Sequence, residues 1–287
     1  MGCTLVWRGF YGVSMTATDS GLDALESVNG LLVDLTDGVL SVTIDRPDSL
    51  NSLTAPVLTG MAEALQRASG DPRVKVVRLG GTGRGFSSGA GIGADDAGSS
   101  EAGGDPVDTL YMANRAVKAI VDMPRPVIAV VQGPTAGVGV SLALACDLVL
   151  CSEKAFFMLA FTKIGLMPDG GASALVAASV GRARAMRMAL LAERIKAAEA
   201  LEWGLVSAVY PADTFTADVD AVIAGLLAGP SRAFANTKKA VNAATLTELD
   251  NALARETEGQ ISLLSGTDFR EGITAFQQHR SPTFTDT

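Results

Sequence analysis

Hydrophobic and polar residues alternate along residues 31–45, which read LLVDLTDGVLSVTID. A period of two residues is typical of strands with one buried face, and the central Asp37-Gly38 favours a tight hairpin turn. The segment therefore predicts two antiparallel strands. Residues 54–70 then show a helical spacing of apolar positions, and the apolar run at 74–79 (VKVVRL) predicts a buried strand.

The succession of strand and helix recurs further along the chain. Residues 126–131 and 147–150 read as apolar strands, and an apolar helix lies between them after the glycine-rich stretch 133–139. Strands that alternate with helices are typical of crossover units, so the pattern predicts an α/β fold. Beyond Gly170 the spacing is nearly all helical, apart from a short strand at 205–210.

These patterns divide the chain into three regions. Residues 1–29 contain a polar stretch of small residues and predict a poorly ordered N-terminal extension. Residues 30–229 carry the alternating strands and helices and form the expected core. Residues 230–287 contain three helical stretches of mixed polarity, which predict a C-terminal helical region that packs on neighbouring subunits.

Composition narrows the classes of function. The 23 basic and 31 acidic residues give a net charge of −8, and no basic run is present, so nucleic acid is not an expected partner. Apolar runs end well before the ~20 residues that a bilayer crossing needs. With no signal-peptide pattern, we expect a cytoplasmic protein that does not bind membranes. His279 is the only histidine, so we expect no metal site and assign proton transfer to carboxylates.

Two glycine-rich loops follow predicted buried strands, at residues 86–91 (FSSGAG) and 133–139 (GPTAGVG). Ligands of open α/β sheets bind at the carboxyl ends of strands. The second loop opens a helix, whose first N–H groups lack intrahelical partners and can receive an anionic oxygen. Alternatively, the glycines only allow tight turns and close packing. Neither loop completes a phosphate-binding or dinucleotide-binding motif.

Six stretches form a pattern that covers most of the chain. They are VLSVTIDRPDSLNSL (39–53), GRGFSSGAGI (83–92), RPVIAVVQGPTAGVGVSLALACDLVL (125–150), FTKIGLMPDGGAS (161–173), GRARAMRMALLAERIKAAEALEWGLVSAVYP (181–211) and FREGITAFQQHRSPTF (269–284). On these stretches the sequence resembles the crotonase, or enoyl-CoA hydratase/isomerase, superfamily. The resemblance implies a spiral of ββα units that binds an acyl-CoA thioester as substrate, with no cofactor, in a homotrimer or a dimer of trimers.

The resemblance also implies a site for the thioester carbonyl oxygen, formed by the backbone N–H groups of Ala90 and Val138. Preorganised donors stabilise the enolate oxygen by roughly 2.7–4 kcal/mol each. Val138 stands where the family commonly has glycine, but a side chain does not remove the amide donor. We expect five further residues to contact the substrate: Ser88, Gly89, Gly137, Ser141 and Phe161.

Hydratases of this superfamily use two glutamates, and the corresponding positions here are Ser141 and Phe161. A serine at its ordinary pKa is not a general base, and a phenylalanine transfers no proton, so hydration by that route should be absent or very slow. Asp169, within MPDGG (167–171), resembles the single catalytic acid of several enoyl-CoA isomerases. One carboxylate can take a proton from C2 and return it at C4. The alternative role for Asp169 is to cap the following helix.

The phosphates of CoA need cations, and the resemblance predicts a lysine where Asp48 stands and another at His279. We expect Arg46 and Lys239 to contact the substrate instead, unless they are ordinary solvated charges. Lys238 and Arg280 are further candidates, with the same alternative.

Three hypotheses follow. The first is a 3,2-enoyl-CoA isomerase of fatty-acid metabolism, with Asp169 as base and Ala90 and Val138 as oxyanion donors. The second is a hydratase or thioester hydrolase of the same superfamily that uses Asp169 or Ser141 with an ordered water. The third is a non-catalytic acyl-CoA binding or delivery protein.

Overall fold

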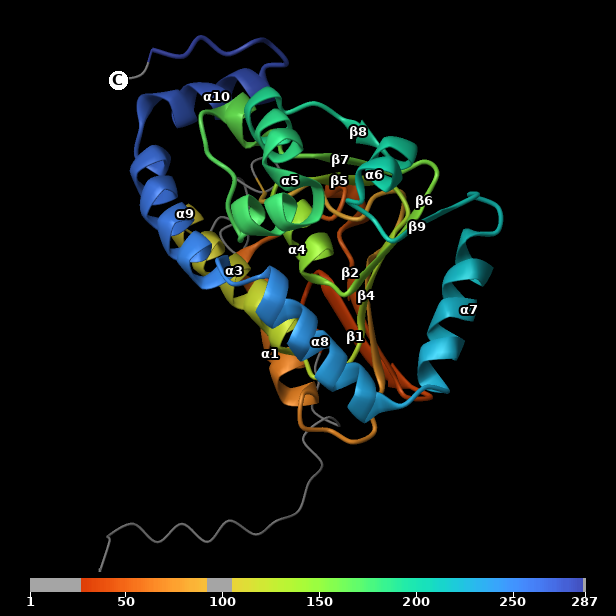
Figure 1. Ribbon diagram of the computed structural model, residues 1–287. Coiled ribbons are helices and arrows are strands. Elements are labelled where there is room, and N and C mark those ends of the chain that lie inside the picture. The colour runs from red at the N-terminus through yellow and green to blue at the C-terminus, as the bar shows by residue number, and fades with distance from the viewer. Residues whose placement is uncertain (1–26, 92–104, 286–287) are drawn as a thin grey trace, which may run out of the picture.

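The computed structural model describes residues 27–91 and 105–285 (Figure 1). The expected N-terminal extension lies almost entirely outside the described residues. The main sheet begins with the predicted hairpin, in which β1 (Leu31–Thr36) pairs antiparallel with β2 (Val39–Ile44). Asp37 and Gly38 connect the strands with φ values of 50° and 85°. Positive φ at both central residues is the geometry of a two-residue hairpin turn, which confirms the prediction.

Four further strands extend this sheet in parallel: β3 (Val76–Gly81), β4 (Val127–Val131), β6 (Leu148–Ser152) and β9 (Ala208–Tyr210). Within the described residues the strand order is β1-β2-β3-β4-β6-β9. Each of the four overlaps a strand predicted from an apolar run. The predicted α/β fold is therefore confirmed.

A smaller sheet, not expected from the sequence, lies beyond the ends of the main strands. Its order is β5 (Pro134–Ala136), β7 (Phe156–Met158) and β8 (Ile195–Lys196). Strands of two or three residues are too short to show a period. β5 also lies in the glycine-rich stretch that the sequence suggested only as a turn.

Helices cover both faces of the main sheet (Figure 1). On one face, α1 (Ala55–Ala68) packs against α3 (Pro106–Asp122), and α3 packs against α4 (Val138–Ala145). Their buried side chains form the larger core together with the sheet. On the other face, α7 (Phe215–Leu227) packs over Val76, Ile128 and Leu150 in a smaller core.

The chain between β7 and β9 is mostly helical, as predicted. A short 3₁₀ turn, η2 (Ala160–Ile164), precedes α5 (Ala172–Leu191), and α6 (Ala197–Trp203) follows β8. α5 bends at Gly181, where φ is 76°. The bend explains why the sequence pattern indicated two separate helices here. Within the part of the chain that the structure describes, no helix combines the length and apolar character needed to span a membrane.

The three predicted C-terminal helices are α8 (Ser231–Thr245), α9 (Leu249–Leu264) and α10 (Thr267–Gln277). α9 and α10 add buried side chains to the larger core of their own chain, and α8 is joined to the same chain by polar contacts. Lys238 Nζ lies 2.9 Å from Asp147 Oδ2 and 3.0 Å from the Ile120 carbonyl oxygen. Asn114 Nδ2 donates to Thr257 Oγ1 at 2.9 Å, which joins α3 to α9. Packing of this region on neighbouring subunits stays a prediction.

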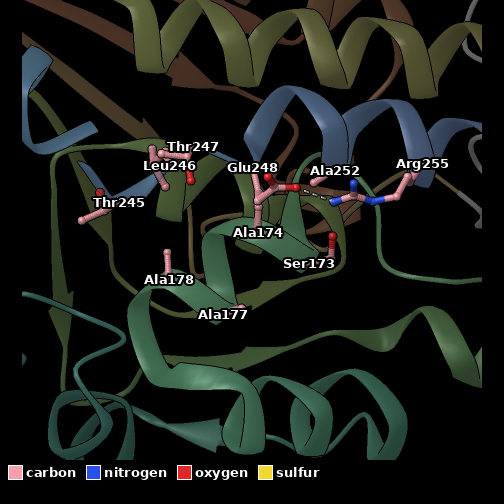
Figure 2. A pocket seen from close by; sticks show the side chains of 10 residues that line it. All are labelled: Ser173, Ala174, Ala177, Ala178, Thr245, Leu246, Thr247, Glu248, Ala252 and Arg255. Carbon is pink, nitrogen blue, oxygen red and sulfur yellow. Dashed lines mark hydrogen bonds and ion pairs between the residues drawn. The ribbon is translucent and has the colours of Figure 1, made fainter. Parts of the chain in front are cut away.

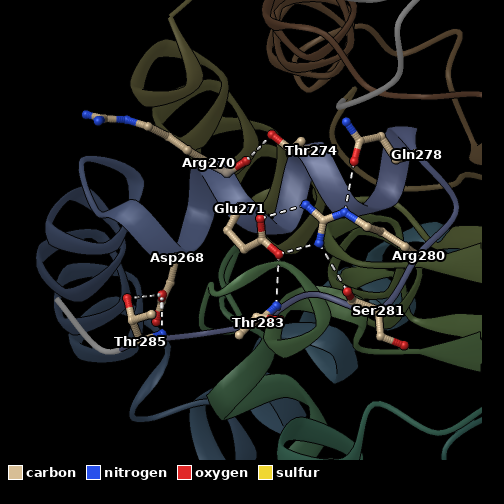
Figure 3. Close-up of polar contacts among 9 residues, drawn as sticks. All are labelled: Asp268, Arg270, Glu271, Thr274, Gln278, Arg280, Ser281, Thr283 and Thr285. Atoms are coloured by element: carbon tan, nitrogen blue, oxygen red, sulfur yellow. Dashed lines mark hydrogen bonds and ion pairs between the residues drawn. The ribbon is translucent and has the colours of Figure 1, made fainter.

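Beyond α10 the chain turns back along the helix (Figure 3). Glu271 accepts hydrogen bonds from the Arg280 guanidinium, one of them at 2.8 Å, and from the Thr283 N–H at 2.8 Å. Asp268 Oδ1 accepts from the Thr285 N–H at 2.8 Å. Arg280, a candidate cation for the CoA phosphates, therefore holds this tail against α10.

Candidate active site

The two glycine-rich loops lie side by side, because residues 86–90 run parallel to β5. Ser87 and Thr135 form a parallel bridge. The Ala136 N–H donates to the Ser87 carbonyl oxygen at 2.9 Å, and the Phe86 N–H donates to the Pro134 carbonyl oxygen at 3.0 Å. Ala90 and Val138 both follow the bridged pair by three residues, one on each segment.

The two backbones also approach each other closely at Gly89 and Gly137, which have φ values of 92° and 53°. A Cβ atom on Gly89 would lie 3.0 Å from the Ala136 carbonyl oxygen and 3.3 Å from Gly137 Cα. One on Gly137 would lie 3.5 Å from Gly89 Cα. The positive φ values and the close contact both favour glycine. Tight turns and close packing, which the sequence suggested as an alternative explanation, therefore account for at least part of the need for glycine at these two positions.

The neighbouring hydrogen bonds limit what the N–H groups of Ala90 and Val138 can bond within the chain. Leu53 donates to the Gly89 carbonyl oxygen at 2.8 Å and accepts from the Gly91 N–H at 3.1 Å. These bonds use the residues on either side of Ala90, so the Ala90 N–H points away from Leu53. Val138 is the first residue of α4, and its N–H has no intrahelical acceptor. Two such N–H groups can stabilise an oxygen that gains negative charge.

Three of the expected site residues surround this contact. The Phe161 ring comes within 3.9 Å of the position that a Cβ on Gly137 would take, and the residue is buried in η2. Ser141 is buried on α4, one turn beyond Val138, and its Oγ donates to the Asp169 carbonyl oxygen at 2.8 Å. The structure thereby brings Asp169 to the helix that begins at Val138.

Ser88 faces another way. Its Oγ donates to the Ser49 carbonyl oxygen at 2.9 Å, and its N–H donates to the Leu50 carbonyl oxygen at 2.8 Å. Ser49 belongs to η1 (Pro47–Ser49). In this structure the Ser88 side chain braces the first loop, and its contact with substrate stays a prediction.

Asp169 is the carboxylic acid whose backbone is hydrogen-bonded to Ser141 on α4. Its Oδ2 accepts a hydrogen bond of 2.7 Å from Gln260 Nε2 on α9. Burial raises the pKa of Asp169 to about 7; the Gln260 hydrogen bond opposes this rise, and the charge of nearby Glu256 adds to it. The residue keeps intermediate exposure. Asp169 can therefore exchange a proton near neutral pH.

The cap of α5 comes from Glu256, not from the Asp169 side chain. Glu256 Oε2 accepts from the Gly171 N–H at 2.6 Å, and its Oε1 accepts from the Ser173 N–H at 2.8 Å. Gly171 occupies the cap position of the helix and makes no side-chain cap. The capping role that the sequence offered as an alternative for Asp169 is therefore filled from α9.

Glu256 and Gln260 contact Asp169 or its neighbours, and the sequence patterns did not single them out. Both are 1% exposed and lie four residues apart, on one face of α9. That face also carries the buried Ala252 and Leu253. Polar residues at positions that the helical period assigns to the core were the available signal, since buried polar side chains need specific partners.

The expected cations have different surroundings. Arg46 Nη1 donates to the Ser52 carbonyl oxygen at 2.9 Å and to Ser52 Oγ at 2.6 Å, which braces the turn after β2. Lys238 forms an ion pair with Asp147. Lys239, the next residue on α8, is exposed. Contact of Arg46 and Lys239 with CoA stays a prediction.

A separate pocket of about 330 Å³ lies between α5 and the turn from α8 to α9 (Figure 2). Small and polar side chains line it, and the Glu248–Arg255 ion pair, at 3.2 Å, lies at one side. Its lining residues are Ser173, Ala174, Ala177, Ala178, Thr245, Leu246, Thr247, Glu248, Ala252 and Arg255. The candidate catalytic residues are not among them.

Comparison with known proteins identifies the family of the chain. The family model described as enoyl-CoA hydratase/isomerase matches residues 34–287. A Rhodobacter capsulatus protein named "Probable enoyl-CoA hydratase" is 41% identical over 90% of this chain and 99% of its own length. The 1,2-epoxyphenylacetyl-CoA isomerase of Escherichia coli K12 is 36% identical over 86% of this chain and 95% of its own.

Among solved structures, an enoyl-CoA hydratase from Mycobacterium avium subsp. paratuberculosis K-10 superposes with a TM-score of 0.84. It is 68% identical to this chain, over 90% of this chain and 99% of its own. The family match extends over most of the chain and includes both glycine-rich loops, Asp169 and α9. The chain belongs to the enoyl-CoA hydratase/isomerase family, an acyl-CoA-processing family of the crotonase superfamily.

Proposed function

We propose that this protein is a 3,2-enoyl-CoA isomerase, with Asp169 as the base and the Ala90 and Val138 N–H groups as donors to the thioester oxygen. The observation that carries the proposal is the placement of Asp169. Its carboxyl group has a pKa of about 7, and its backbone is bonded to Ser141 on the helix that starts with Val138. A general base works best when its pKa lies near the working pH.

The reaction needs only this carboxylate and the two donors. Asp169 takes a proton from C2 of the 3-enoyl thioester, and the electron pair moves into a dienolate whose oxygen is held by the N–H groups. The protonated Asp169 then delivers a proton to C4 while the double bond forms between C2 and C3. The carboxylate is regenerated, and no water, oxidant or reductant is consumed.

Ser141 and Phe161 argue against rapid hydration. The Ser141 hydroxyl donates to the Asp169 carbonyl oxygen, and the Phe161 side chain has no proton to exchange. A hydratase stays the second candidate because the Rhodobacter capsulatus relative carries that name. A thioester hydrolase, in which Asp169 activates water, belongs to the same alternative. Assembly as a homotrimer or a dimer of trimers is part of the proposal by family resemblance.

The test is to incubate the protein with 3-enoyl-CoA and 2-enoyl-CoA thioesters of several chain lengths. Products are followed by mass and by ultraviolet absorbance of the conjugated thioester. We expect 3-enoyl-CoA to become 2-enoyl-CoA with no change in mass, and hydration to be at least about 10²-fold slower. A faster gain of one water identifies a hydratase, and release of free CoA identifies a hydrolase. Tight binding without turnover identifies an acyl-CoA carrier.

A further inference from the structure

We infer that Gln260, on α9, is a positioning residue that fixes Asp169 so that Oδ1 is the oxygen that exchanges the substrate proton. The inference rests on the proposed function. Gln260 is 1% exposed and lies 91 residues from Asp169 in the sequence. Both the oxygen and the nitrogen of its amide group form hydrogen bonds with the segment that contains Asp169.

The amide makes three hydrogen bonds to residues 167–169. Oε1 accepts from the Met167 N–H at 3.1 Å, and Nε2 donates to the Met167 carbonyl oxygen at 3.0 Å. The second hydrogen of Nε2 goes to Asp169 Oδ2 at 2.7 Å. A flipped amide would place its oxygen against two acceptors and its nitrogen against a donor, so the backbone of Met167 fixes the orientation of the amide.

This arrangement makes the two oxygens of Asp169 unequal. Oδ2 always faces a neutral donor that cannot accept a proton, because an amide nitrogen has no basic lone pair at neutral pH. Oδ1 is left for the substrate. The donor also favours the charged form of the carboxylate, while the nearby carboxylate of Glu256 disfavours it. Two side chains one turn apart on α9 thus act on the same acid in opposite senses.

Ser141 completes the clamp from the other side. Its hydroxyl holds the Asp169 carbonyl oxygen, and α4, which carries it, begins at the Val138 donor. The position of the acid relative to the oxyanion donors is therefore set by α4 and α9 together. An error of about 1 Å in such a placement can reduce a rate about 10²-fold.

The test compares Gln260→Met with the parent in the full-length chain. Methionine keeps the length of the side chain and removes the amide donors. As a control, Glu258→Met introduces the same residue at an exposed position of α9. For 3-enoyl-CoA isomerisation we expect Gln260→Met to lower kcat about tenfold at the high-pH plateau, with KM within about twofold. The inflection of its pH–rate profile should also move upward.

Two further variants separate positioning from folding. Gln260→Glu keeps the shape but places a second carboxylate against Asp169, so its inflection should rise further than that of Gln260→Met. Glu256→Gln removes a negative charge near Asp169, so the inflection of its pH–rate profile should move to lower pH. A merely structural role would lower the melting temperature and leave the inflection in place.

The outcomes are distinct. Opposite shifts for the Gln260 and Glu256 variants, with a parental profile for Glu258→Met, support the inference. If the parent isomerises and the soluble Gln260 variants keep its kcat and inflection, Gln260 is not a positioning residue and the proposed function is untouched. If the parent does not isomerise any 3-enoyl-CoA, the proposed function fails, and the role of Gln260 in it fails as well.

Discussion

The two halves of the candidate site are built in different ways. The oxyanion half is backbone, and residues 86–90 and 134–138 shape it through their own pairing. The acid half is a side chain whose surroundings come from α9, 85 to 93 residues further along the sequence. The first depends on glycine geometry at two loops, and the second depends on the docking of a distant helix. Changes to each half should therefore fail in different ways.

The largest expected effect comes from removing the C-terminal helices. A chain that ends at Gly229 loses the Glu256 cap of α5, the Gln260 clamp and the Lys238 partner of Asp147. It also exposes apolar surface beneath α9, so we expect aggregation or loss of cooperative unfolding. Light scattering after size exclusion and a thermal melt measure this. A monodisperse truncated chain with the parental melting temperature would contradict it.

A substitution confined to the oxyanion half should reduce the rate of isomerisation while α9 stays docked against Asp169. In Gly89→Ala, the new Cβ would lie 3.0 Å from the Ala136 carbonyl oxygen at a φ of 92°. We expect about 1–3 kcal/mol of destabilisation from backbone strain. Displacement of the Ala90 N–H should reduce isomerisation by about 10²–10³-fold.

Gly70→Ala is the matched control for that substitution, because a Cβ there meets nothing within 4 Å. Kinetics with 3-enoyl-CoA and chemical denaturation of both variants provide the comparison. Parental kcat/KM in Gly89→Ala would show that the close contact of the loops does not position the donor.

The Lys238–Asp147 ion pair, which anchors α8, should affect the free energy of unfolding more than the rate of isomerisation. The Lys238 side chain is largely buried, with 8% exposure, whereas the Asp147 side chain is 22% exposed. Lys238→Met leaves Asp147 without its cation, which we expect to cost about 2–3 kcal/mol of unfolding free energy. Lys239→Met, one residue further along on the exposed side of α8, should change it by no more than about 0.5 kcal/mol. Equal denaturation midpoints for the two variants would show that the Lys238–Asp147 ion pair does not stabilise the fold.

The smallest effect is expected at the C-terminal tail. The hydrogen bonds from Arg280 lower the pKa of Glu271 from 4.5 to about 2, and the smaller contribution of the Thr283 N–H acts in the same direction. Because the folded pKa is depressed, this contribution to stability is present above the unfolded value and is lost as the pH falls through about 2. Amide hydrogen exchange at Thr283, measured from pH 5 down to pH 2, should show progressive loss of protection. Constant protection over that range would exclude the linkage.

The same contrast explains how much could be predicted from the sequence. The hairpin at Asp37-Gly38, the parallel strands and the two loops follow from local patterns, so they were predictable. Asp169 was identified by resemblance. Its surroundings were not, because the sequence does not show which face of α9 packs against which loop. Glu256 and Gln260 are polar residues in a buried stripe, and only the folded chain pairs them with residues 167–173.

The central claim is that Asp169 is the base, and the most direct measurement is the pH–rate profile of 3-enoyl-CoA isomerisation for the parent and Asp169→Asn. The parent rate should rise with pH through an inflection near 7, as the raised pKa of Asp169 requires. Asp169→Asn should lose about 10²-fold or more at every pH and keep its acyl-CoA affinity. Its melting temperature should change little, because Glu256 caps α5. A variant that isomerises at the parent rate would contradict the account.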